Sequence, residues 1–290
     1  MYITFSEFLE QIISSPALLV ITILNLGVIL VNGWTDAPNA IATCVSTRSL
    51  SPKKAIMMAA VFNFIGVFLM TLINATVVQT IYNMVDFGSN AEQALIALAA
   101  AMFAIVVWAV VAWWFGIPTS ESHALIAGIS GAAIAIQKGF SGVNGNEWIK
   151  VIYGLVISTV LGFGLGFLVT KMIRKICKNI QRQKATRFFK KSQVVGGAAM
   201  AFMHGAQDGQ KFMGIFLLGI CLASGNAGVT DFTIPLWLMV LCSATMTIGT
   251  SIGGYRIIKT VGMKMVAMEP YEGTSADIAG ACGLLASSVF

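Results

Sequence analysis

Long stretches without a charged residue constrain the fold of this chain more than any other feature. The longest separate Glu10 from Asp36, Lys54 from Asp86, Glu92 from Glu121, Lys150 from Lys171 and Asp231 from Arg256. A helix needs roughly 20 apolar residues to cross about 30 Å of hydrocarbon. Only 10% of the 290 residues are charged and 57% are hydrophobic, whereas a soluble domain carries about 25% charged residues. The sequence therefore predicts an all-α polytopic membrane protein and excludes disorder, collagen and coiled coil.

The basic residues indicate the orientation of the chain. Nine of its 18 Lys and Arg residues lie between Lys171 and Lys191, with no acid among them. We expect crossings near residues 17–46, 55–82, 93–115, 117–137, 149–170, 194–224 and 234–258, although residues 93–137 leave room for a hairpin. With the N-terminus outside, the segment 171–191 is cytoplasmic, and the positive-inside rule favours this topology. The prediction is a multi-pass protein of the plasma membrane.

A short motif occurs twice in the chain. Residues 32–36 read NGWTD and residues 204–208 read HGAQD, and each follows an apolar run. Five expected crossings make up the first unit, and this odd number inverts the second unit. Inverted repeats with broken or re-entrant helices around a midplane site are typical of transporters. We therefore divide the chain into a first repeat (1–170), a basic loop (171–193) and a second, inverted repeat (194–290).

Two acids, Asp36 and Asp208, lie within apolar surroundings. A carboxylate there costs several kcal/mol unless it is paired, hydrated or bound to a cation, so both are functional candidates. We expect the residues that flank them to break the helices, namely Gly33, Pro38, Gly205 and Gly209. A broken helix offers N–H groups to anions and carbonyls to cations. Two alternatives stay open: Asp36 only caps a helix, or Asp208 only pairs with Lys211.

A polar turn, GIPTSESH at 116–123, joins two apolar runs. Pro118 tends to end the preceding helix, and Thr119 or Ser120 can cap the next one. Hydroxyl groups at a helix N-terminus suit an oxyanion or an alkali ion, while an ordinary capped turn is the alternative. Asn63, in the middle of an expected helix, would line the pathway or only form an interhelical hydrogen bond.

These motifs resemble those of the inorganic phosphate transporter (PiT) family. The matching segments are NGWTDAPNAIAT at 32–43, GIPTSESHALIAGISGA at 116–132, AFMHGAQDGQKFMG at 201–214 and GTSIGGYRIIKTVG at 249–262. The resemblance extends from about residue 20 to the C-terminus. It implies a symporter of the bacterial cytoplasmic membrane that imports phosphate with Na⁺ or H⁺ by alternating access.

The residue types and this resemblance together indicate a site. For the oxyanion we expect Thr35, Asn39, Thr119, Ser120, Ser122, Gln207 and Gln210. For the coupling cation or proton we expect Asp36, Asp208, Asn63 and Asn32, with sodium possible at the two acids. Glu121, Gln207 and Pro38 depart from the family's usual residues, and Asn63 falls where some members have a glutamate. The coupling ion and the exact oxyanion therefore stay open, with sulfate as the rival substrate.

Other classes of function are weaker candidates. An intramembrane aspartyl protease would use two acids, but neither Gly-x-Gly-Asp nor Tyr-Asp occurs at either site. An anion channel is a third possibility. We expect no cofactor besides the co-transported ion and no nucleic acid; the partners are phosphate, the ion and the bilayer, and a homodimer stays open. On the repeat pattern, the counterpart of the polar turn would begin just after Phe290. We therefore expect the second repeat, 194–290, to be incomplete and to lack roughly 40–50 residues at its C-terminus.

Overall fold

The computed structural model describes residues 3–225, 233–253, 255–265 and 267–289. In these residues the chain is almost entirely helical, and the β-type pairing that occurs among them is one isolated antiparallel bridge, Val85 to Val143. The all-α fold expected from the uncharged runs is confirmed.

The first part of the chain forms α1 (Phe5–Ser14), α2 (Pro16–Thr35), the 3₁₀ turn η1 (Ala37–Ile41), α3 (Ala42–Ser46), α4 (Pro52–Ile73), α5 (Thr76–Tyr82), α6 (Ala91–Phe115), α7 (Glu121–Gln137), η2 (Phe140–Gly142) and α8 (Gly145–Ile176). The second part forms α9 (Arg182–Ala223), α10 (Leu236–Gly253), α11 (Tyr255–Ile258), the π-helical η3 (Lys259–Met265) and α12 (Pro270–Val289).

The described helices include four runs that are long and apolar enough to cross a membrane. These are Pro16–Ser46, Pro52–Ile73, Ala91–Phe115 and Gly145–Ile176. A fifth is formed by Leu236–Ile252 and Tyr255–Gly262 if this pair, bent by 55°, is one span. Local signals explain where several of them begin: Pro16 and Pro52 occupy first-turn positions, where a missing N–H costs nothing.

α6 and α7 form an antiparallel hairpin. The start of α6 and the end of α7 lie at the same end of the molecule, where the backbone N–H of Asp86 donates to the carbonyl of Gly142. α7 has 17 residues, a length of about 25 Å, and it begins at the fully buried Glu121. The expected segment 93–115 is thus helical, and the segment 117–137 is helical from Glu121 onward. The turn between them ends at this buried acid.

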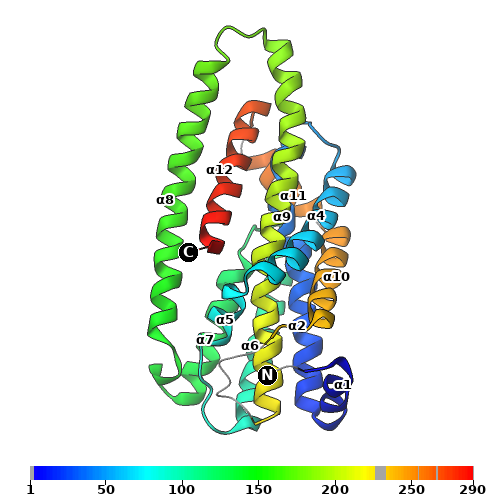
Figure 1. Cartoon of the computed structure of the whole chain (residues 1–290), viewed down its shortest axis with the longest axis vertical. Coiled ribbons are helices and arrows are strands. Elements are labelled where there is room, and N and C mark those ends of the chain that lie inside the picture. The colour runs from blue at the N-terminus through cyan, green and yellow to red at the C-terminus, as the bar shows by residue number, and fades with distance from the viewer. Residues whose placement is uncertain (1–2, 226–232, 254, 266, 290) are drawn as a thin grey trace.

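The two ends of the molecule differ. α1 lies at one end, and the basic segment that joins α8 to α9 lies at the other (Figure 1). This arrangement agrees with the expectation that the N-terminus and residues 171–191 occupy opposite sides of the membrane. Which side is cytoplasmic stays a prediction.

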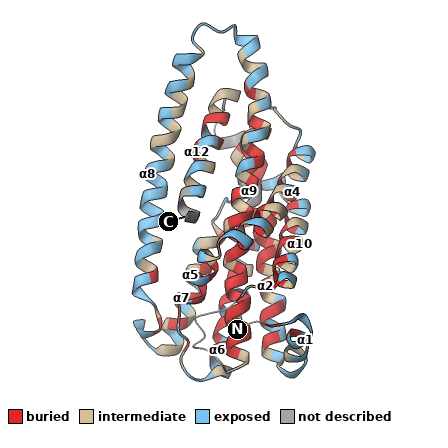
Figure 2. Ribbon diagram, viewed as in Figure 1, coloured by how far each residue is buried: buried red, intermediate tan, exposed pale blue. Residues whose placement is uncertain are grey.

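α9 is the central helix, and its C-terminal half is almost wholly buried against α2, α4, α5 and α6 (Figure 2). The break that we expected at Gly205 and Gly209 is wrong, because α9 runs through both residues. Both glycines instead face α4: an added Cβ at Gly205 would lie 2.7 Å from the Asn63 Cα, and one at Gly209 would lie 2.9 Å from the Val67 Cβ. They allow the two helices to approach closely. The break after Asp36 is present as η1.

Candidate functional site

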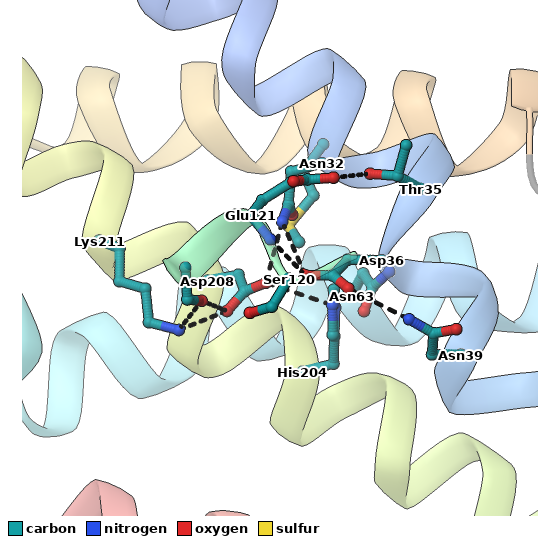
Figure 3. Close-up of polar contacts among 12 residues, drawn as sticks. Asn32, Thr35, Asp36, Asn39, Asn63, Ser120, Glu121, His204, Asp208 and Lys211 are labelled. Atoms are coloured by element: carbon teal, nitrogen blue, oxygen red, sulfur yellow. Dashed lines mark hydrogen bonds and ion pairs between the residues drawn. The ribbon is translucent and has the colours of Figure 1, made fainter. Parts of the chain in front are cut away.

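Two acids from the repeated motif meet inside the bundle. The amide Nδ2 of Asn32, on α2, donates to Asp208 Oδ2 at 3.0 Å and to Asp36 Oδ2 at 3.5 Å (Figure 3). A primary amide carries two N–H groups, so it can serve both carboxylates at once. Residues that are 172 positions apart in the sequence are thereby joined through one side chain. Asn32 itself is fully buried.

Asp36 lies at the C-terminal end of α2 and faces the N-terminus of α7. Its carboxylate accepts from Asn39 Nδ2 at 3.1 Å and from the backbone N–H of Glu121 at 3.4 Å. The partial positive charge of a helix N-terminus favours a carboxylate in this position. Its backbone N–H also donates to the carbonyl of Asn32, so Asp36 ends α2 and contributes its side chain to the cluster.

Asp208, on α9, accepts from several donors. Lys211 Nζ lies 2.7 Å from Oδ1, and Ser122 Oγ, from α7, lies 3.5 Å from the same oxygen. His204 Nε2 lies 3.2 Å from Oδ2, an ion pair whenever the imidazole is protonated, although without hydrogen-bond alignment. Lys211 also donates to Ser122 Oγ at 2.5 Å. The ion pair with Lys211, left open by the sequence, is therefore present.

Glu121 is a third acid of the cluster. Its Oε1 accepts from Thr35 Oγ1 at 2.6 Å and from Thr119 Oγ1 at 3.5 Å, while Oε2 has no hydrogen-bond partner among the described residues. Ser120 caps α7, because its Oγ accepts from the backbone N–H of His123 at 3.4 Å. The predicted cap and polar turn are confirmed, and Thr35 lies against Glu121.

The cluster contains one arrangement that could hold a small cation. One ligand atom each from Asp36, His204 and Asp208 lies within 4.8 Å of the others. Carboxylate oxygens suit hard cations, whereas an imidazole nitrogen is more typical of transition metals or of proton transfer.

Three of the predicted site residues donate their hydrogen bonds to groups other than the acids of the cluster. Asn63 lies beside the cluster (Figure 3), and its amide donates to Thr250 Oγ1 of α10 at 3.2 Å, the interhelical contact named as its alternative role. Gln207 Nε2 donates to the carbonyl of Leu284 on α12, and Gln210 Nε2 donates to the carbonyl of Asn74, which ends α4. The structure therefore does not bring the two glutamines to the acids.

Sequence reasoning left His204 and Asp277 out of the site. His204 lies four residues before Asp208, so the helical spacing that indicated the pair with Lys211 could also have placed His204 on the same face. Asp277, on α12, is a further buried acid outside the cluster, and it accepts from Thr43 Oγ1 at 2.8 Å and from Gln193 Nε2 at 2.6 Å. It borders an uncharged run and carried no motif signal.

Buried acids and amides beside an interrupted helix, within a bundle of membrane-length helices, define a membrane transporter. The model of the phosphate transporter family matches residues 32–290, and the chain belongs to that family.

Two bacterial relatives illustrate the similarity. The probable low-affinity inorganic phosphate transporter of Bacillus subtilis (strain 168) is 39% identical over 251 residues, covering 87% of this chain and 73% of the relative. The protein of the same description from Mycobacterium leprae (strain TN) is 32% identical over 274 residues, covering 94% of this chain and 64% of the relative. The chain thus spans less than the full length of either. Because the family and these relatives are transporters, the protease alternative is set aside.

A solved structure shares the fold. It is described as the sodium-dependent phosphate transporter and matches with a TM-score of 0.82 at 20% sequence identity, covering 95% of this chain and 85% of that one. At this identity the match supports the architecture and leaves the site to be argued from its own residues.

Proposed function

We propose that this protein imports inorganic phosphate together with a cation, Na⁺ or H⁺, by alternating access. The observation that carries the proposal is the Asn32 amide, which joins the acids of the two motif copies beside the N-terminus of α7. Family membership and the phosphate-transporting relatives support the substrate, and the sodium-dependent structural neighbour supports coupling to a cation.

The charges of the acids and of phosphate decide where the substrate and the ion bind. A phosphate anion beside bare carboxylates would be repelled strongly in a medium of low dielectric constant. A cation or a proton at the acids removes this repulsion. We therefore assign the ion to the acids, Asp36 and Asp208, and the oxyanion to the hydroxyl and N–H groups at the start of α7, in particular those of Thr119, Ser120 and Ser122.

The repeats provide the alternating access. We propose that residues 1–170 and 194–290 are inverted repeats that rock against each other around this site, in the plasma membrane. The N-terminus then lies outside and the basic residues of 171–191 lie in the cytoplasm, as the positive-inside rule favours.

Ligand-dependent thermal stability of the detergent-purified protein tests the proposal. A ligand at 100 times its Kd stabilises the folded state by about 2.7 kcal/mol. We expect phosphate with the coupling ion to raise the melting temperature, and sulfate to leave it unchanged. Na⁺ and K⁺ are compared at two pH values to separate sodium from proton coupling. A shift with sulfate alone would contradict the proposed substrate.

A transport measurement separates a symporter from a channel. In proteoliposomes, we expect saturable phosphate accumulation above its equilibrium distribution, driven by an imposed ion gradient. Phosphate flux that only equilibrates across the membrane would exclude the coupled mechanism.

A further inference from the structure

Both oxygens of the Asp208 carboxylate already have polar groups of the protein as neighbours. It is approached by Lys211 Nζ and Ser122 Oγ at Oδ1, and by Asn32 Nδ2 and His204 Nε2 at Oδ2. An ionised carboxylate offers about four lone-pair positions. Four neighbouring groups on these two oxygens leave little room for an additional ion.

Asp36 has a different environment. Its hydrogen-bond donors are the amides of Asn32 and Asn39 and the backbone N–H of Glu121, all neutral and all at 3.1 Å or more. A ring nitrogen of His204 also lies within 4.8 Å of one of its oxygens. Among the described residues, Asp208 forms an ion pair with Lys211, whereas Asp36 forms no ion pair. The two acids of the repeated motif are therefore not equivalent: Asp208 has a lysine as its counter-charge, and Asp36 forms no ion pair with any residue that the structure describes.

We propose that the ammonium group of Lys211 is a tethered cation that takes the place of a transported ion at Asp208, so that Asp36 is the acid that takes up the coupling ion. This inference rests on the proposed function and narrows its coupling site. It revises the expectation of sodium at both acids. The short contacts of Nζ with Asp208 and Ser122 also bring a positive charge to the start of α7, where the oxyanion is proposed to bind.

A lysine is suited to this role. Its ammonium is a compact point charge with three N–H donors on a flexible stem. The side chain is only 17% exposed and Asp208 only 7%, so the pair is largely desolvated. Removing one partner of such a pair leaves an uncompensated buried charge.

The test uses Lys211→Met, which keeps an unbranched side chain of nearly the same length and removes its charge, with Lys211→Arg as the matched control. In the absence of phosphate, we expect added methylammonium to raise the melting temperature of the methionine variant and to leave the wild type and the arginine variant unchanged. We expect added Na⁺ to raise the melting temperature of the methionine variant by more than that of the other two proteins, in which Asp36 alone can take up the ion. A methionine variant that folds and responds to neither cation would overturn the proposal.

Phosphate binding gives the second readout. We expect the methionine variant to bind phosphate at least about tenfold more weakly at low Na⁺, with recovery at high Na⁺ or with methylammonium. In the wild type, Na⁺ should support binding with a Hill coefficient of about 1 or be dispensable. A wild type that requires two Na⁺ ions overturns the inference, even if the methionine variant cannot be purified. Absence of phosphate binding by the wild type under all ion conditions would instead refute the proposed function.

Discussion

Gly205 lies where α9 packs closely against the backbone of α4, and it offers a direct test of how the two helices pack. A Cβ added there would lie 2.7 Å from the Asn63 Cα and would collide with the Asn63 carbonyl oxygen. These are backbone atoms of α4, so no side-chain end can move aside. We expect Gly205→Ala to destabilise the protein by forcing the helices apart.

The change in the free energy of unfolding caused by Gly205→Ala is the difference between two opposing contributions. Replacing a helical glycine by alanine stabilises by about 0.5–1 kcal/mol through the backbone entropy of the unfolded chain. Overpacking a well-packed contact costs about 1–3 kcal/mol, and the rigid neighbour at Gly205 favours the upper value. The net cost is therefore about 2 kcal/mol. For a chain of this size, this lowers the melting temperature by roughly 4–8 °C.

The measurement is thermal unfolding of the purified protein in detergent, with Gly164→Ala as the matched control. Gly164 is also a glycine within a membrane-length helix, α8, but a Cβ there meets no atom within 4 Å. This control should be as stable as the wild type or slightly more stable. If Gly205→Ala behaved like the control, α9 and α4 would not approach each other as described, and our account of this glycine would be refuted.

Three further predictions concern the site and its surroundings. Asp36→Asn should abolish ion-coupled phosphate uptake while the protein still inserts and folds, since the amide cannot carry the ion; unchanged uptake in proteoliposomes would exclude the assigned role. Ser120→Ala should cost about 0.5–2 kcal/mol, because α7 loses its N-cap, and thermal unfolding measures this. Hydrogen bonds from the backbone and side chain of Thr4 lower the pKa of Glu7. The capping of α1 should therefore persist above the unfolded pKa of about 4.3 and be lost as the pH falls through the folded pKa, which amide hydrogen exchange would detect.

Much of the fold could be predicted because hydrocarbon imposes a simple rule on the sequence. Uncharged runs of sufficient length become helices, and Pro16, Pro52 and Ser120 mark where three of them begin. The polar turn before α7 was predicted from its capping residues alone. The packing of the helices was harder to predict. In a single sequence, a glycine that breaks a helix cannot be distinguished from a glycine that allows a neighbouring helix to approach closely.

Part of the site could be predicted for the same physical reason, the constraint that hydrocarbon imposes on polar residues. Asp36 and Asp208 stood out because acids are rare in apolar surroundings, and the structure joins them. Gln207 and Gln210 carried the same motif signal, yet they point from α9 toward α12 and α4, because successive residues of an unbroken helix face different directions. A broken helix, which we had expected here, would have allowed all of them to face the site.

The two copies of the motif thus build different local structures, and one residue accounts for the difference. Both copies share Gly-x-x-Asp, but the first is followed by Pro38, which has no N–H to donate and whose ring clashes with the carbonyl four residues earlier. The helix ends at Thr35, and the chain continues in η1. The second copy has Gly209 and Gln210 in the corresponding stretch, so the hydrogen bonds of α9 continue and its glycines serve the contact with α4. The proline, more than the shared glycine, determines which copy of the motif is broken. It also places Asp36 at a helix end, where its carboxylate meets neutral donors, while Asp208 stays within a helix beside Lys211.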